Sequence, residues 1–274
     1  MGAPGPLADQ PDHVRINREH WTRANASHAD TRAAGKWGRQ EIAWGLWDTP
    51  ERDVRVLPDV ASRDVIELGC GTAYFSAWLR RRGARRVVGI DVTPAQLETA
   101  RRLDEEWALG LELIEASAEA VPLPDASFDL AVSEYGASIW CDPDRWIPEA
   151  ARLLRPRGEL VFMRNSTLSM LCNRDSGQVS DSLHRSQRSL SRLEWTGDDA
   201  GVEFHPCPRR PAAPAPEKRF RGPGPGRGLR ARSSHGPPRV LVRDGGLGPK
   251  LAGRGDLASA EAGEHRLSFP AHNR

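Results

Sequence analysis

The chain has 274 residues, 38% of them hydrophobic, and a formal net charge of +2, which suits one α/β domain with extensions. It shows neither a membrane-spanning apolar stretch nor the hydrophobic run of a signal peptide, so we expect a cytoplasmic protein that does not enter a membrane. Its four cysteines are widely spaced and form no metal-ligand motif, so we predict no metal site.

Residues 1–62 are expected to form a tryptophan-rich helical extension. The chain reads as helical from His20 to Trp47, and Trp37, Trp44 and Trp47 would share one face of that helix. Such a face either packs against the main domain or serves as a lid over a cofactor or an aromatic wall for a substrate.

Residues 63–166 alternate short apolar segments with amphipathic ones. This alternation predicts parallel strands joined by right-handed helical crossovers, hence an α/β fold with a Rossmann-like, doubly wound, mostly parallel sheet. The predicted strands are Asp64–Leu68, Arg86–Ile90, Leu111–Glu115, Phe128–Ser133 and Leu160–Arg164. The predicted helices are Ala73–Arg82, Pro94–Trp107 and Arg145–Leu154.

The end of the first predicted strand carries the most informative motif. Glu67 is followed by Gly69 and Gly71, and the second strand ends in Asp91, twenty residues after Gly71. A glycine turn lets a ligand approach bare backbone, and a carboxylate that ends the next strand can bind ribose hydroxyls. The pattern indicates an adenosine-containing cofactor. A nicotinamide-dependent oxidoreductase shares such a turn, but the third glycine of its fingerprint is absent.

Three further motifs narrow the class. Residues 116–119 follow the third strand, residues 123–130 lead into the fourth, and residues 152–160 close a helix and open the fifth. As a series, the segment from about Asp64 to Arg164 resembles the class I S-adenosylmethionine-dependent methyltransferases, in particular the type 11 group of small-molecule enzymes.

That resemblance implies roles for individual residues. The turn of Gly69, Cys70 and Gly71 would face the methionyl part of S-adenosylmethionine, and Asp91 would hold its ribose. The adenine would lie against Val92, Ala118 and Glu119. Glu67 and Glu134 would offer negative potential to the sulfonium, although Glu67 could instead serve as an acceptor within the turn. The chain departs from the family pattern at Ala73, Ser117 and Arg157, where glycine, aspartate and glycine are common.

The segment after the fourth strand is where this fold presents substrate. Glu134 and Tyr135 lie there and are the candidates for orienting a methyl acceptor, and residues 167–205 are expected to form a linker on the substrate side. The Asn-Pro-Pro-aromatic motif of amino-directed nucleic-acid methyltransferases is absent, which favours a small-molecule acceptor over nucleic acid.

Residues 206–274 differ sharply in composition from the rest. They hold 14 Lys/Arg against 5 Asp/Glu and 11 of the 22 prolines, with no Ile, Trp or Tyr. We predict that this tail is disordered, because it cannot bury enough apolar surface to offset its ordering entropy. Our hypothesis is that a frameshift after about His205 replaced the family's last strands. The alternative is a native basic tail that binds nucleic acid, as in an RNA methyltransferase.

Overall fold

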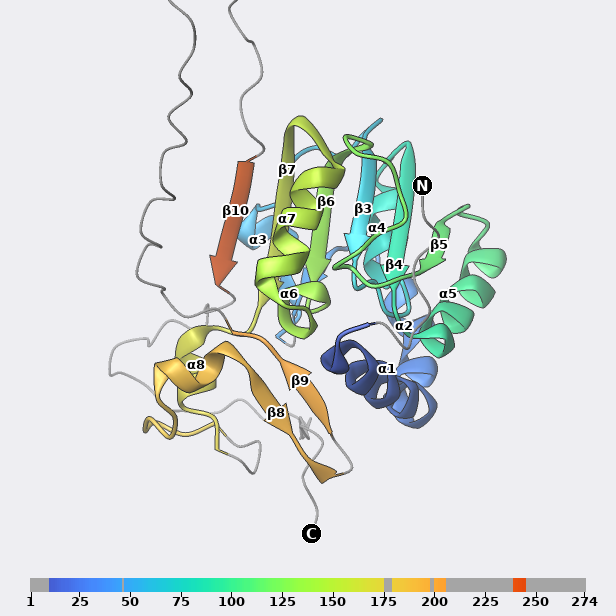
Figure 1. The fold of residues 1–274 in the computed structure, drawn as a ribbon. Helices are drawn as coiled ribbons and strands as arrows, with labels where there is room; N and C mark the ends of the chain where they lie inside the picture. The colour runs from blue at the N-terminus through green and yellow to red at the C-terminus, as the bar shows by residue number, and fades with distance from the viewer. Residues whose placement is uncertain (1–9, 46, 175–178, 198–199, 206–238, 245–274) are drawn as a thin grey trace, which may run out of the picture.

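The computed structural model describes residues 10–45, 47–174, 179–197, 200–205 and 239–244 (Figure 1). Its centre is a six-stranded sheet in the order β10-β7-β6-β3-β4-β5, in which every neighbouring pair is parallel. These strands are β3 (Asp64–Leu68), β4 (Arg86–Asp91), β5 (Glu112–Glu115), β6 (Phe128–Glu134), β7 (Leu154–Arg164) and β10 (Arg239–Asp244). The predicted doubly wound parallel sheet is confirmed.

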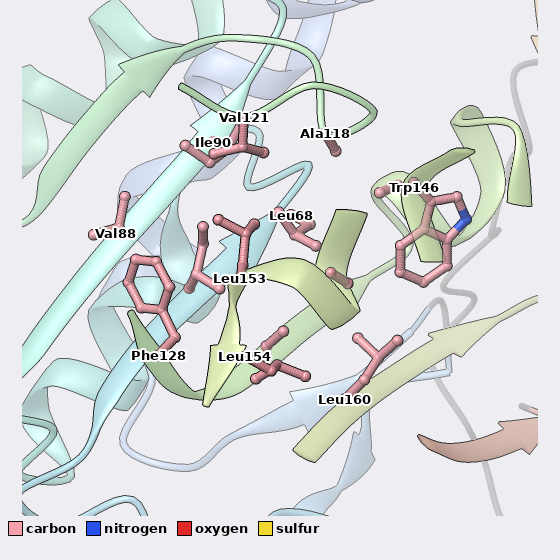
Figure 2. Packing of buried hydrophobic residues seen from close by; sticks show 14 of the residues in the cluster. Leu68, Val88, Ile90, Ala118, Val121, Phe128, Trp146, Leu153, Leu154 and Leu160 are labelled. Carbon is pink, nitrogen blue, oxygen red and sulfur yellow. The ribbon is translucent and has the colours of Figure 1, made fainter. Parts of the chain in front are cut away.

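Helices cover both faces of this sheet because its strands are apolar on both sides. The helices of the core are α4 (Tyr74–Arg81), α5 (Pro94–Trp107), α6 (Ala137–Trp140) and α7 (Pro143–Leu153). On β3, Ile66 and Leu68 belong to one buried cluster, which Trp146 and Leu153 of α7 complete (Figure 2). Val65 faces the opposite cluster, where Phe75 and Trp78 of α4 lie.

Ion pairs around a buried aspartate stabilise the amino ends of the central strands. Asp64, with its side chain 8% exposed, accepts hydrogen bonds from Arg85 (2.9 and 2.6 Å) and Arg155 (2.8 Å). Its backbone N–H donates to Asp129 (2.9 Å), which also pairs with Arg155. The hydrogen bond from Arg85 is the main cause that lowers the pKa of Asp64 to about 2.

The amino-terminal extension differs from its prediction. It consists of α1 (Asp12–Ala24), a π-helical segment η2 (Asn25–Ala29), α2 (Asp30–Trp37), the two-residue strands β1 (Ala43–Trp44) and β2 (Thr49–Pro50), and α3 (Glu51–Val54). The helix therefore ends at Trp37, and the prediction of one helix through Trp47 is wrong. Trp44 instead lies in β1 and donates to Glu51 (2.5 Å), while Gly45 takes φ +66°, a left-handed conformation that stops a helix.

The segment after β7 folds back toward α1. It contains α8 (Thr167–Leu171), the 3₁₀ turn η3 (Gln187–Ser191) and the antiparallel hairpin of β8 (Leu193–Trp195) and β9 (Gly201–Glu203). The side-chain amide of Asn17 on α1 forms two hydrogen bonds with the backbone of Val202 in β9. Its Nδ2 donates to the C=O (2.8 Å), and its Oδ1 accepts from the N–H (2.7 Å). Figure 1 shows α1 and this hairpin beside each other, beyond the carboxyl ends of the sheet strands.

Two boundaries differ from prediction for identifiable reasons. Strand β7 begins at Leu154, six residues before the predicted start, and its register with β6 shifts between Phe128 and Leu130. Arg157 has φ +69° within that irregularity, in the conformation that glycine adopts at least cost. Likewise α4 begins at Tyr74, because Ala73 has φ +57°. These are two of the positions where the resembled family often has glycine.

Within residues 206–274, which we predicted to be disordered, Arg239–Asp244 form β10 and pair in parallel with Glu159–Arg164 of β7. An unpaired sheet edge offers N–H and C=O groups to any strand-forming segment, and Val240, Leu241 and Val242 have high strand propensity. The remainder of this tail lies outside the described residues, as does most of the segment that the frameshift hypothesis concerns. Among the helices that the structure describes, none combines the length and the apolarity needed to cross a membrane.

Candidate cofactor-binding site

The glycine turn lies at the carboxyl end of β3 and is anchored to β4. The N–H groups of Gly69 and Cys70 both donate to the carbonyl of Ile90, at 2.8 and 2.9 Å. Gly69 has φ +77°, and a Cβ there would lie 2.5 Å from the backbone nitrogen of Ala137. Gly71 has φ +55°, and its Cβ would lie 2.7 Å from Gln96 Oε1. The close backbone of Ala137 therefore requires glycine at position 69, and the positive φ favours glycine at position 71, which leaves bare backbone at the turn.

Asp91 joins this turn to the start of α5. Its Oδ2 accepts from the N–H of Gly71 and its Oδ1 from the N–H of Thr93, both at 2.8 Å. The side chain is half-buried, and burial raises the pKa of Asp91. Val92 follows it and is also half-buried. The acidic residue predicted to hold ribose thus ends β4 directly beside the glycine turn, as the sequence indicated.

Glu67 lies inside the domain, only 2% exposed. Its Oε2 accepts from both the N–H (2.8 Å) and the hydroxyl (2.5 Å) of Ser76, in the first turn of α4. Burial raises the pKa of Glu67 to about 8, and the charges of Glu134 and Asp91 add to the effect. Glu67 is therefore an acceptor for the helix that follows the turn, and its charge would be repelled by those of Asp91 and Glu134.

Cys70 points into the core. Its sulfur fills the space beside Gly89 on β4, where a Cβ would come within 2.9 Å of Sγ. The side chain is 3% exposed, and burial raises the pKa of its thiol well above the usual range. Only the backbone of Cys70 is thus disposed to meet a ligand at the turn.

Ala118 and Glu119 follow β5 as predicted, but both are enclosed by protein. Ala118 packs in the core cluster of β3 and α7. The Glu119 carboxylate contacts His13 Nε2 (2.6 Å), the N–H of Asp142 (2.8 Å) and Arg145 Nε (2.9 Å). Glu119 therefore ties α1 to the loop before α7, a role that sequence reasoning missed because its partner His13 is 106 residues away.

Glu134 ends β6 and is 7% exposed. Its Oε1 accepts from the N–H of Gly45 (2.8 Å), and its Oε2 accepts from the hydroxyl of Tyr74. Tyr135 has φ +52°, and its ring lies so near Gly45 that a Cβ on that glycine would be 2.7 Å from Cε2. Tyr74 and Gly45 were not identified from the sequence, since nothing in their local pattern indicates a partner 60 or 89 residues away.

The amino-terminal extension contacts the site from several sides. Trp37 Nε1 donates to the carbonyl of Thr72 (2.8 Å), and Asn25 Nδ2 donates to the carbonyl of Ala95 (3.1 Å). With the bonds of His13 and Gly45, these contacts reach every loop that carries a predicted cofactor residue. Among the described residues, no group of three or more His, Cys, Asp or Glu side chains could hold a metal ion.

Comparison with known proteins identifies the domain. Residues 66–162 match the family model described as a methyltransferase domain. The chain is 30% identical over 129 residues to a demethylmenaquinone methyltransferase of Thermus thermophilus, covering 47% of this chain and 53% of that protein. It is 34% identical over 138 residues to a malonyl-[acyl-carrier protein] O-methyltransferase of Serratia marcescens, covering 49% and 50%. An S-adenosylmethionine-dependent methyltransferase structure from Mesorhizobium loti aligns with a TM-score of 0.45 and 24% identity, covering 56% of this chain and 72% of that chain.

The chain spans about half the length of these two curated relatives. Its residues 66–162 match a methyltransferase domain, in keeping with the resemblance to the class I, S-adenosylmethionine-dependent methyltransferases. S-adenosylmethionine is the cofactor of that class.

Proposed function

We propose that this chain binds S-adenosylmethionine across the turn of Gly69–Gly71 and transfers its methyl group to a small-molecule acceptor. Asp91 would bind the ribose hydroxyls, Val92 and Ala118 would border the adenine, and the backbone of Cys70 and Gly71 would meet the methionyl part. Glu67 and Glu134 would supply negative potential to the sulfonium. Glu119 would act indirectly, by holding α1 and the loop before α7 in place.

One observation carries this proposal: at the carboxyl edge of the sheet, beside a turn of bare backbone that Asp91 anchors, Glu67 lies close enough to Asp91 and Glu134 for the charges of both to raise its pKa. Carboxylates gathered in this way are stabilised by a bound cation. The donor carries a net positive charge because its sulfur is a sulfonium, and a carboxylate at the end of the second strand suits the ribose hydroxyls. The residues present therefore fit this cofactor.

The cofactor supplies an activated methyl group, so the protein has mainly to align an acceptor with it. A nucleophilic atom of the acceptor would form the new bond to the methyl carbon in place of sulfur, and a proton carried by that atom would pass to water. Glu134 and Tyr135, at the end of β6, are the proposed groups that orient the acceptor.

The names of the relatives support a small acceptor, since one of those proteins is named for demethylmenaquinone and another for malonyl-[acyl-carrier protein]. The alternative of a nucleic-acid-binding protein or RNA methyltransferase depends on the basic tail, most of which lies outside the described residues. No contact described in the site favours that alternative.

The test is calorimetric titration of the full chain with S-adenosylhomocysteine and, separately, with NAD. We expect S-adenosylhomocysteine to bind and NAD not to bind. Asp91→Ala should weaken binding about 100-fold, because it removes charge-assisted hydrogen bonds to the ribose. Asp129→Ala is the matched control: its carboxylate also accepts from a backbone N–H, at the opposite edge of the sheet, so it should leave affinity unchanged. Equal affinity in the wild type and Asp91→Ala would contradict the proposed site.

A further inference from the structure

A buried hydrogen-bonded cluster fixes the orientation of Glu134. One carboxylate oxygen accepts from the N–H of Gly45 (2.8 Å) and the other accepts from the hydroxyl of Tyr74. The two donors come from different parts of the chain, the extension and the start of α4. A carboxylate held by a separate donor on each oxygen has little freedom to rotate, and bonds to an ionised acceptor are the strong ones.

The first turn of α4 holds two of the three carboxylates of the site. Tyr74 donates to Glu134, and Ser76, two residues later, donates to Glu67 through both its N–H and its hydroxyl. This turn follows directly on the glycine turn, after Ala73. The same backbone segment that would meet the cofactor therefore also determines where the negative charge of the site lies.

A cation lies behind the phenol ring of Tyr74. The ammonium nitrogen of Lys36 is 4.0 Å from the ring centroid, a cation–π contact. The carbonyl of Lys36 accepts from Trp78 Nε1 (3.0 Å), which fixes the end of α2 against α4. Burial lowers the pKa of Lys36, whereas the charge of Glu134 raises it. Glu134 thus has a hydroxyl donor and a nearby cation on the same side.

We infer that Tyr74 is a positioning residue that aims the Glu134 carboxylate at the charge of the methyl donor, so that the site distinguishes donor from product, while Lys36 opposes that charge and limits the preference. Methyl transfer converts a sulfonium into a neutral thioether. Glu134 then loses its cationic partner, which favours release of S-adenosylhomocysteine, and the repulsion between Lys36 and the sulfonium disappears. This inference rests on the proposed function.

The experiment compares the affinities of the full chain for S-adenosylmethionine and S-adenosylhomocysteine by calorimetry. Tyr74→Phe keeps the ring and the Lys36 contact but removes the hydroxyl. The preference for the charged donor should fall about tenfold, the size expected for one hydrogen bond to a charged group. Lys36→Met removes the opposing charge, so it should raise the same preference by about two- to threefold.

Thr99→Val is the matched control, because it also removes a buried hydroxyl that donates to a carboxylate, Asp30 Oδ1, at 2.7 Å. It should leave the affinity ratio unchanged. An unchanged ratio in Tyr74→Phe, with S-adenosylhomocysteine still bound, would overturn the inference. If Tyr74→Phe does not fold, Lys36→Met provides the test. An unchanged or lower preference for S-adenosylmethionine over S-adenosylhomocysteine in that variant would also overturn the inference. Failure of the wild type to bind either compound would instead overturn the proposed function.

Discussion

Strand β3 carries two buried carboxyl groups only three residues apart, and their pKa values lie on opposite sides of neutrality. At the amino end, Asp64 is paired with two arginines, and its pKa is lowered to about 2. Near the carboxyl end, Glu67 has hydroxyl and amide donors but two carboxylates as neighbours, and its pKa is raised to about 8. Ionisation of Asp64 therefore stabilises the fold, whereas ionisation of Glu67, on the same strand, destabilises it.

This contrast indicates that the amino edge of the sheet contributes to stability and the carboxyl edge to function. At the amino edge each negative charge has a guanidinium beside it, as a structural ion pair requires. At the carboxyl edge burial raises the pKa values of Glu67 and Asp91, and the charges of Asp91 and Glu134 add to the effect on Glu67. Perturbed pKa values of this kind are characteristic of functional sites. A bound cation would stabilise such a group of carboxylates, and the proposed methyl donor is a cation.

The largest effect on the pH dependence of stability is expected from neutralising Glu67. A carboxyl group whose pKa is higher in the folded chain than in the unfolded chain lowers stability as pH rises between the two values, here from 4.5 to about 8. The free energy of unfolding of the wild type should therefore fall by on the order of 3 kcal/mol between pH 5 and pH 8. Glu67→Gln can still accept from Ser76, so it should remove most of that fall. Urea denaturation at a series of pH values measures the free energy of unfolding of the two proteins. The same dependence on pH in the wild type and in Glu67→Gln would refute the raised pKa.

A smaller effect of opposite sign is expected at the other end of the strand. The lowered pKa of Asp64 stabilises the fold above about pH 4, and this contribution is lost as pH falls toward 2. Asp64→Asn should therefore cost about 2 kcal/mol at neutral pH and almost nothing near pH 2. The exposed ion pair of Arg52 and Asp53 supplies the control, since Asp53→Asn should change stability little. A cost for Asp64→Asn that does not depend on pH would show that the charge is not its cause.

The smallest expected effect involves no charged pair. Arg157 is exposed, has φ +69° and lies at the amino edge. Relief of left-handed strain, about 1–2 kcal/mol, exceeds the extra entropy that glycine gives the unfolded chain. Arg157→Gly should therefore stabilise the fold by about 0.5 kcal/mol, measured as the midpoint of urea denaturation. Arg157→Ala keeps the strain and should show no gain, so equal midpoints for the two variants would contradict the explanation.

Local pattern was sufficient for much of the fold. The bounds of β3 and α5 were predicted without error, because an apolar run that ends in glycine and a Thr-Pro helix start are local signals. The tryptophan spacing was misleading after Trp37, because Gly45 and the contacts of Trp44 with Glu51 override helical periodicity there. Strand β10 was not predicted, because the composition of the whole tail does not indicate that a six-residue segment of it pairs with the edge of the sheet.

For the candidate site, the sequence identified which residues lie at the carboxyl edge but not how their side chains are used. Gly69, Gly71 and Asp91 were recognisable by their positions relative to two strands. The partners of Glu119 and Glu134 were not, since His13 and Tyr74 meet them only through packing between distant segments. Their roles toward the cofactor remain predictions that binding experiments can test.

The most direct test of a cation site at this edge counts protons released on binding at pH 7, from calorimetry in two buffers of different ionisation enthalpy. Glu67 is largely protonated at that pH, and a positive charge beside it lowers its pKa. S-adenosylmethionine should therefore release about half a proton to one proton more than neutral S-adenosylhomocysteine does. Equal proton release for the two compounds would contradict the account.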